Sequence, residues 1–174
     1  AASDVYKRQP MYNALTGGAA NLGGKTWVFD QYHDGHFGVG PAKGGGDYDG
    51  TPKWWSCPAN GKLESSLYTQ EFTFVQVGVK MIWKNNGKIY TNEAGKNDLG
   101  GAATVPGAGD FDVEYTPKES YTYTLDEINN TLTLSDGAFM GHYTGSSTYF
   151  IRSLTEDELY LEVVSNVESG NGWW

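Results

Sequence analysis

Alternation of apolar and polar residues is the feature that most constrains this chain, and it is clearest near the C-terminus. In SYTYTLDEINNTLTLSDG, residues 120–137, large and polar side chains alternate on both sides of a short polar turn. A period of two places successive side chains on opposite faces of a strand, so each such run predicts a half-buried β-strand. Similar runs within 65–78, 110–116 and 149–164 predict an antiparallel all-β domain made of consecutive hairpins.

The remaining segments predict turns and loops. KMIWKNNGKIYTN, residues 80–92, predicts a β-hairpin, because Asn-Gly between two β-rich runs favours a type I′ turn. Glycine-rich stretches at 33–53 and 92–109 predict two long loops. No segment keeps a helical period over three turns, and LTEDEL, residues 154–159, has room for a single turn at most.

The two ends of the chain need separate treatment. Residues 1–9, AASDVYKRQ, are similar to the in-frame translation of an adapter used in sequencing-library preparation, so we interpret them as an artefact of a metagenomic fragment and exclude them from the fold. We expect residues 10–174 to form a single all-β domain that is truncated at both ends. A stretch of that length is sufficient for one hydrophobic core.

Charge and cysteine content exclude several classes of function. The chain has 12 Lys and Arg against 21 Asp and Glu, a net charge of −9, and no basic cluster. Such a surface repels nucleic acids and anionic membranes. No apolar run approaches the roughly 20 residues of a transmembrane helix. The single cysteine, Cys57, rules out an internal disulfide, and we interpret it as a small buried hydrophobic residue.

The sequence shows no catalytic pattern, and we predict that the chain is not an enzyme. A glycosidase needs two carboxylates facing each other across a cleft. The acids in DVE (112–114) and EDE (156–158) are instead predicted to lie on a solvated strand face and in a hairpin turn.

Metal ligands are sparse, and we predict no resident metal. HDGH (33–36) brings His33, Asp34 and His36 together, but no further ligand follows the histidine pair in a recognisable pattern. Asp47 and Asp49, in GGGDYDGT, are weak candidates for a structural calcium site, because they lack the distant glutamate of an EF-hand.

Aromatic residues within loops point to carbohydrate. Sugars present apolar C–H faces and hydroxyl edges, which suit exposed rings beside polar groups. Trp54 and Trp55 are adjacent, so in an extended segment they face opposite ways. We expect one indole to anchor the glycine-rich loop and the other to face solvent beside Tyr48 and His36. The predicted ligand-binding residues are Trp54, Trp55, Tyr48, His36, Phe37, Asp34, Trp83 and Tyr90.

Three stretches also carry a resemblance to a known family: LGGKTWVFD (22–30), GHFGVGP (35–41) with the following WW, and NNTLTLSDGAFMGHYTG (129–145) with the strands after it. Across most of residues 15–174 the chain resembles lipocalin-like β domains of Bacteroidota surface lipoproteins from glycan-utilisation systems. The resemblance implies an up-and-down antiparallel meander forming a barrel, with a jelly-roll β-sandwich as the alternative. It also implies an extracellular or outer-membrane surface location and further domains in the same polypeptide.

Together, these observations predict a non-catalytic carbohydrate-binding domain of a bacterial cell-surface protein. The alternatives are a structural spacer without a ligand and a lipocalin-like binder of a small apolar molecule. A glycoside hydrolase fits less well, since no catalytic pair is recognisable.

Overall fold

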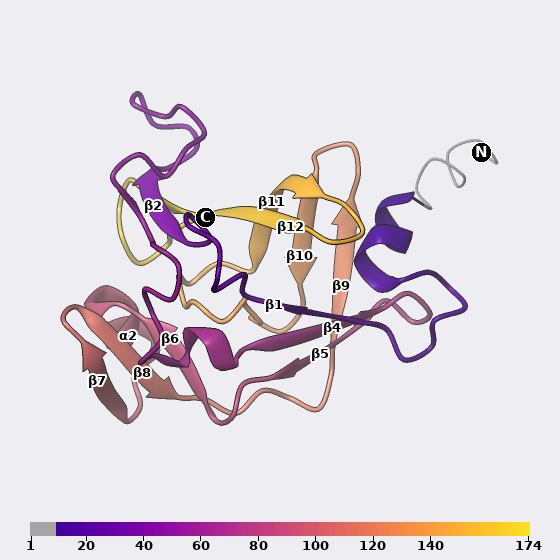
Figure 1. The fold of residues 1–174 in the computed structure, drawn as a ribbon, viewed down its shortest axis with the longest axis horizontal. Helices are drawn as coiled ribbons and strands as arrows, with labels where there is room; N and C mark the ends of the chain where they lie inside the picture. Colours follow the sequence, from indigo (N-terminus) through magenta and orange to yellow (C-terminus); the bar gives the residue numbers. More distant parts are fainter. Residues whose placement is uncertain (1–9) are drawn as a thin grey trace.

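The computed structural model describes residues 10–174, so the interpretation of residues 1–9 as an artefact lies outside the described residues. The described chain is mostly antiparallel β-structure, which confirms the predicted all-β class. Its main sheet has ten strands (Figure 1). Their spatial order is β1 (Lys25–Val28), β4 (Glu71–Val75), β5 (Lys80–Lys84), β9 (Tyr121–Asp126), β10 (Thr131–Leu134), β11 (Thr148–Leu154), β12 (Leu159–Val164), β13 (Asn171–Trp173), β2 (Gly38–Pro41) and β3 (Trp55–Ser56).

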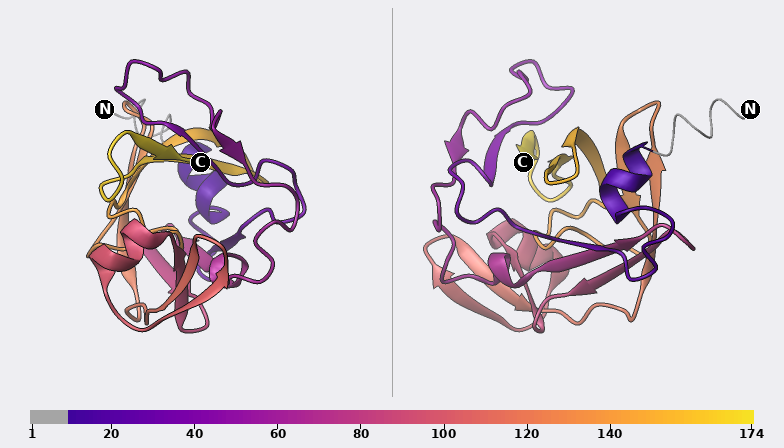
Figure 2. Two further views of the ribbon diagram at one scale, coloured as in Figure 1. Left: turned by 90° about the vertical axis from the view of Figure 1, so that its left-hand side faces the viewer. Right: turned by 45° about the vertical axis from the view of Figure 1, so that its right-hand side comes forward.

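The main sheet curls over itself, so that β2 and β12 lie across from β4 and β5 (Figure 2). Its two end strands are β1 and β3, and among residues 10–174 no β-ladder joins them to close the sheet. The second sheet has three strands in the order β6 (Lys88–Thr91), β8 (Asp110–Glu114) and β7 (Ala103–Gly107).

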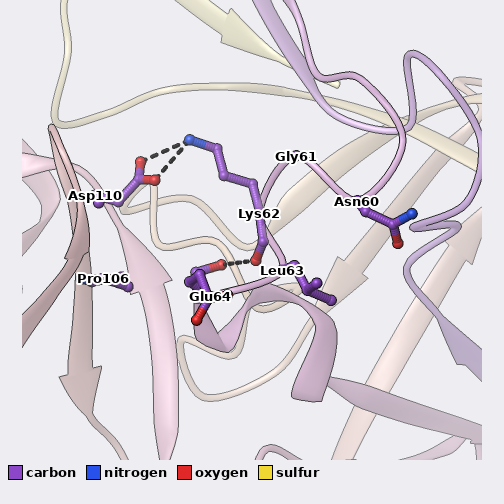
Figure 3. A pocket seen from close by; sticks show the side chains of 9 residues that line it. Asn60, Gly61, Lys62, Leu63, Glu64, Pro106 and Asp110 are labelled. Atoms are coloured by element: carbon purple, nitrogen blue, oxygen red, sulfur yellow. Dashed lines mark hydrogen bonds and ion pairs between the residues drawn. The ribbon is translucent and has the colours of Figure 1, made fainter.

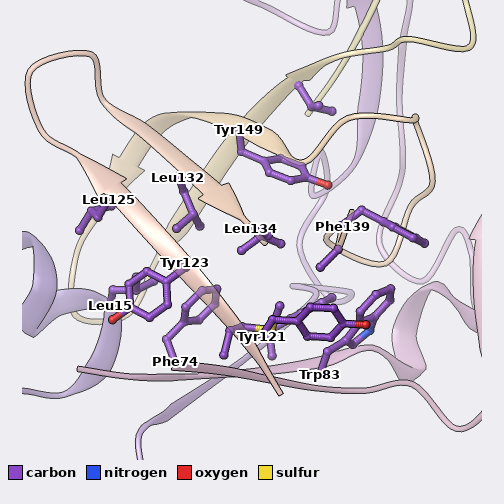
Figure 4. Packing of buried hydrophobic residues seen from close by; sticks show 14 of the residues in the cluster. Leu15, Phe74, Trp83, Tyr121, Tyr123, Leu125, Leu132, Leu134, Phe139 and Tyr149 are labelled. Atoms are coloured by element: carbon purple, nitrogen blue, oxygen red, sulfur yellow. The ribbon is translucent and has the colours of Figure 1, made fainter. Parts of the chain in front are cut away.

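The predicted alternation is seen directly in the meander, which we define as strands β9 to β12. In β9 every second residue is buried, and β10 follows the same rule. Leu125 pairs with Leu132 in the antiparallel ladder between them, so both leucines reach the same face. That face packs against Phe72, Phe74 and Trp83 in the main core (Figure 4). The concave side of the sheet is therefore filled by side chains.

The predicted hairpin at residues 80–92 is wrong, although its turn is present. Asn86 and Gly87 both have positive φ, as a type I′ turn requires. The strands on either side nevertheless separate: β5 pairs with β4 and β9, whereas β6 pairs with β8. The Asn85 amide donates to the Tyr115 carbonyl oxygen at 2.9 Å, and this bond ties the turn to the segment after β8. The chain therefore passes from one sheet to the other at this turn.

The two predicted glycine-rich loops are also more ordered than expected. Residues 92–109 contain helix α2 (Glu93–Leu99), capped by the Asn92 side chain, and strand β7. Residues 33–53 contain β2, where a Cβ at Gly40 would collide with the backbone oxygen of Thr51. Glycine is needed there because the backbone of the returning loop lies directly against the strand. Two further helical segments are residues 10–16 and the 3₁₀ helix η1 (Ser66–Thr69).

Candidate functional site

The tryptophan pair lies at an edge of the main sheet. Trp55 begins β3, which pairs only with β2 among the described strands. Trp54 is 53% exposed and Trp55 is 38% exposed. The Trp55 ring meets Phe37 edge-on at 6.1 Å, whereas no ring contact of Trp54 occurs within residues 10–174. Trp55 thus combines attachment to the core with an exposed surface, and Trp54 faces solvent.

Phe37 and Tyr90 lie behind Trp55. Both are buried, and with Cys57 and Leu67 they form a second, smaller core cluster. Phe37 contacts Tyr90 edge-on at a centroid distance of 5.7 Å. The prediction that these two rings contact a ligand is therefore wrong, because packing encloses both of them. Phe37 supports Trp55 directly and Tyr90 supports Phe37. The burial of Cys57 agrees with its interpretation as a small hydrophobic residue.

Beside Trp55, Lys62 and Asp110 form a half-buried ion pair. The Lys62 ammonium donates to both carboxylate oxygens of Asp110, at 2.9 and 2.8 Å. The Tyr90 hydroxyl donates to Asp110 Oδ1 at 2.6 Å. Burial, followed by this bond to Asp110, raises the pKa of Tyr90, so the phenol keeps its proton. Lys62 Nζ also lies 5.0 Å from the centroid of the Trp55 ring.

The ion pair forms part of the wall of an open pocket of about 340 Å³ (Figure 3). Lys62 reaches across to Asp110 on β8, while Asn60 lies on the far side of Lys62 in this view. The pocket therefore offers amide, ammonium and carboxylate groups close to an exposed indole. Its lining residues are Asn60, Gly61, Lys62, Leu63, Glu64, Ser65, Pro106, Gly107 and Asp110. We refer to this hollow together with Trp55 as the Trp55 pocket.

His36 and Asp34 stabilise the loops around the pocket. His36 Nδ1 lies 2.7 Å from the His33 carbonyl oxygen, which can only accept, so in the neutral ring Nδ1 carries the proton. The Tyr68 hydroxyl then donates to His36 Nε2 at 2.7 Å and accepts from the Lys62 backbone N–H at 3.0 Å. Asp34 Oδ1 accepts from the Ala59 N–H at 2.8 Å. These contacts give both predicted residues a loop-fixing role, and Asp34 remains exposed.

Tyr48 is directed elsewhere. Its hydroxyl donates to Glu162 Oε1 at 2.9 Å and accepts from Arg152 Nη1 at 3.3 Å. Burial, followed by the bond to Glu162, raises the pKa of Tyr48. This side chain fastens the glycine-rich loop to β11 and β12, and no ring contact joins Tyr48 to either tryptophan among the described residues.

Trp83 belongs to the main core. Its ring is 3% exposed and stacks on Phe72, with centroids 5.7 Å apart. Its indole N–H donates to Gln70 Oε1 at 2.9 Å. The prediction that Trp83 contacts a ligand is wrong, because Trp83 lies on the core-facing side of β5.

Of the two weak calcium candidates, Asp47 and Asp49, the Asp49 carboxylate is engaged by protein groups. Asp49 Oδ1 accepts from the backbone N–H and the hydroxyl of Thr51, and these bonds lower the pKa of Asp49. The Lys53 ammonium donates to the Asp47 carbonyl oxygen at 2.7 Å and lies 3.7 Å from Asp49 Oδ2. A cation at this position would be repelled by that ammonium. Among residues 10–174 no group of three His, Cys, Asp or Glu side chains is placed to hold a metal.

Sequence reasoning missed the residues that shape the pocket. Lys62 and Asp110 are 48 positions apart and were not singled out, because no periodicity links them. DVE (112–114) was predicted to be a solvated strand face, yet Asp112 is buried and accepts from the Ser66 N–H at 2.8 Å. The available signal was the position of Asp110 and Asp112 at the start of a strand preceded by a glycine-rich turn.

Comparison with known proteins adds no relative: the sequence matches no family model, and no curated protein matches it. Within the described residues, no helix is long and apolar enough to cross a membrane.

Proposed function

We propose that this chain is a non-catalytic carbohydrate-binding domain, and that the glycan binds in the Trp55 pocket. The observation that carries the proposal is a partly exposed indole that packs on Phe37 and lies 5.0 Å from Lys62 Nζ, in the polar wall of an open hollow. A sugar ring placed there stacks its apolar face on the indole and turns its hydroxyls toward Lys62 and Asp110. Little rotamer freedom is lost on binding, because the ring and the ion pair are already fixed.

Binding without hydrolysis is supported by how the pocket carboxylate is engaged. Asp110 accepts two hydrogen bonds from Lys62 and one from Tyr90. General acid catalysis by a glycosidase needs a carboxyl group that carries a proton and reaches the leaving oxygen. A carboxylate paired with an ammonium and a phenol O–H is arranged as a hydrogen-bond acceptor. We therefore propose that Asp110 orients a sugar and does not cleave it.

The proposed setting is the surface of a bacterium, as one domain of a larger lipoprotein. Support comes from the resemblance of residues 15–174 to lipocalin-like domains of glycan-utilisation systems. The acidic character of the chain, with a net charge of −9, fits a partner that is neither nucleic acid nor an anionic membrane.

The test is a glycan array probed with the wild-type protein and two single variants. Trp55→Ala removes the proposed stacking surface and is expected to abolish the array signals. Trp54→Ala is the matched control: it removes the adjacent and more exposed indole and is expected to leave the signals unchanged. Loss of signal in Trp54→Ala alone would show that the glycan binds at Trp54, just before β3, and not in the Trp55 pocket. Absence of any glycan signal with the wild-type protein would favour the structural spacer.

A further inference from the structure

We infer that the Trp55 pocket selects neutral sugars through two neighbouring hydroxyls and discriminates against acidic sugars. This inference rests on the proposed carbohydrate-binding function and specifies the ligand class of the same site. It follows from the hydrogen-bonding capacity that remains at the Lys62–Asp110 pair, and from the charges that line the hollow.

The first step is the count of donors at Lys62. An ammonium group has three N–H donors. Two of them point to the Asp110 oxygens, at 2.9 and 2.8 Å. Lys62 Nζ makes no other hydrogen bond within the described residues, and its remaining contacts are with the Trp55 and Tyr90 rings, whose centroids lie 5.0 and 5.5 Å away. A ligand hydroxyl would take the third N–H from these weaker ring contacts. The lysine side chain is 14% exposed, so the group is held firmly but remains within reach of the hollow.

The second step is the count of acceptors at Asp110. Oδ1 accepts from both Lys62 and Tyr90, whereas Oδ2 accepts from Lys62 alone among the described residues. A carboxylate oxygen has two lone pairs, so Oδ2 keeps acceptor capacity. A free donor and a free acceptor therefore lie next to each other on the pocket wall, on two groups less than 3 Å apart.

This arrangement matches a vicinal diol. Neighbouring ring hydroxyls lie within hydrogen-bond distance of one another, and each can both donate and accept. One hydroxyl accepts from Lys62 while its neighbour donates to Asp110, so the ion pair stays intact and both bonds involve a charged group. Hydrogen bonds of that kind are the stronger class. Removal of either hydroxyl leaves one charged group without a ligand partner.

The charges that line the hollow account for the discrimination against acidic sugars. Its charged lining residues are Lys62, Glu64 and Asp110, one cation and two anions, and the cation is already paired with Asp110. Glu64 is exposed at the surface of the pocket. A uronic acid or a sulfated sugar brings a further negative charge into this environment, where like charges repel.

The experiment changes the sugar first, so that it does not depend on the folding of variants. Wild-type protein is titrated by NMR with the methyl glycosides of glucose, galactose and mannose and with the monodeoxy analogues of each. It is also titrated with the methyl glycosides of the corresponding uronic acids, whose carboxylates are free and charged. For at least one hexose, we expect two deoxy analogues at adjacent carbons to bind about tenfold more weakly than the parent, as loss of a charge-assisted bond predicts. We expect its uronate to bind more weakly as well.

Glu64→Gln serves as the protein-side test, because Glu64 lies outside the ion pair and its side chain is exposed. We expect this variant to bind the neutral hexose as the wild type does, and to bind the uronate several-fold more tightly. Equal binding of all deoxy analogues, or stronger binding of uronates by the wild type, would overturn the inference and leave carbohydrate binding intact. Failure of every sugar to bind would overturn the proposed function itself.

Discussion

The meander and the Trp55 pocket use aromatic and polar residues in contrasting ways. In strands β9 and β10 the ladder is regular and alternate side chains enter one large core, and the meander continues through β11 and β12, whose pairing shifts register between Ile151 and Ser153. Around the pocket the chain is less regular: β3 has only two residues, and the lining residues 60–65 lie outside any strand. The chain there is fixed by backbone hydrogen bonds between loops, such as that from the Cys57 N–H to the Phe37 carbonyl oxygen at 2.7 Å, and by side-chain hydrogen bonds of His36, Asp34 and Tyr68.

The difference explains where a binding function can reside. A regular ladder satisfies its own backbone groups, and its inward side chains are fully used in packing. The irregular region satisfies part of its backbone through polar side chains, and lysine, aspartate and amide groups meet there. The small cluster containing Phe37 and Tyr90 supports these groups from behind. The meander thus supplies stability, and the pocket region supplies chemistry.

The largest effect is expected from a core residue of the meander. Leu132 is fully buried in β10, so Leu132→Ala should destabilise the protein by about 2–5 kcal/mol through lost burial and the cavity left behind. Equilibrium urea unfolding measures this change. Tyr32→Ala is the control, since Tyr32 is 77% exposed and should change the free energy of unfolding by less than about 0.5 kcal/mol. Equal effects would contradict the assignment of stability to the meander.

The next largest effect is expected on the pH dependence of stability, through His142, which is buried behind the pocket. His142 is buried against Phe37 and Trp173, and burial lowers its pKa from 6.5 to about 3. The unfolded chain therefore binds a proton that the folded chain excludes. Stability from this residue is present above pH 6.5 and is lost as the pH falls toward 3, by up to about 1.4 kcal/mol per pH unit. Unfolding measured from pH 7 to pH 4 should show a shallower slope for His142→Phe than for the wild type. Identical slopes would contradict the burial of a neutral His142.

A smaller effect is expected from the ion pair. Lys62→Met keeps the aliphatic stem but removes two hydrogen bonds to Asp110, which leaves the carboxylate with Tyr90 alone. We expect a loss of roughly 1–3 kcal/mol in the free energy of unfolding. Lys53→Met is the matched control, because Lys53 is more exposed and contacts only the glycine-rich loop. If both variants cost the same, the Lys62–Asp110 pair is not a structural element of the pocket.

The smallest effect is expected at Tyr68. Tyr68→Phe removes the hydroxyl that joins His36 to the Lys62 backbone, at a cost of about 1 kcal/mol. Because the same bond positions Lys62, glycan affinity should also fall several-fold in isothermal titration calorimetry. Unchanged affinity with reduced stability would show that this bond stabilises the fold without positioning the pocket.

The same contrast explains how much the sequence alone could predict. Strands β9 and β10 were predicted from alternation because their pairing partners are adjacent in the chain. The turn at Asn86 and Gly87 was predicted from local conformation, but its strands pair with distant segments, so the hairpin was wrong. An exposed tryptophan beside the glycine-rich loop was predicted because Trp54 and Trp55 are adjacent, and adjacent residues of an extended segment face opposite ways.

The pocket itself could not be predicted because its parts meet only in the folded chain. Lys62 comes from a turn-rich segment and Asp110 from the start of β8, and neither shows a local signal of binding. Composition identifies Trp83 and Tyr90 as aromatic residues but does not distinguish a buried ring from an exposed one. Their burial is determined by which sheets β5 and β6 join.

The most direct test of the account is an NMR titration that follows the indole N–H signals of the six tryptophans, assigned by single substitution, with a glycan selected on the array. We expect the Trp55 signal to shift in proportion to saturation, while the signals of Trp54 and Trp83 stay in place. A shift of the Trp54 signal without that of Trp55 would contradict the proposed site.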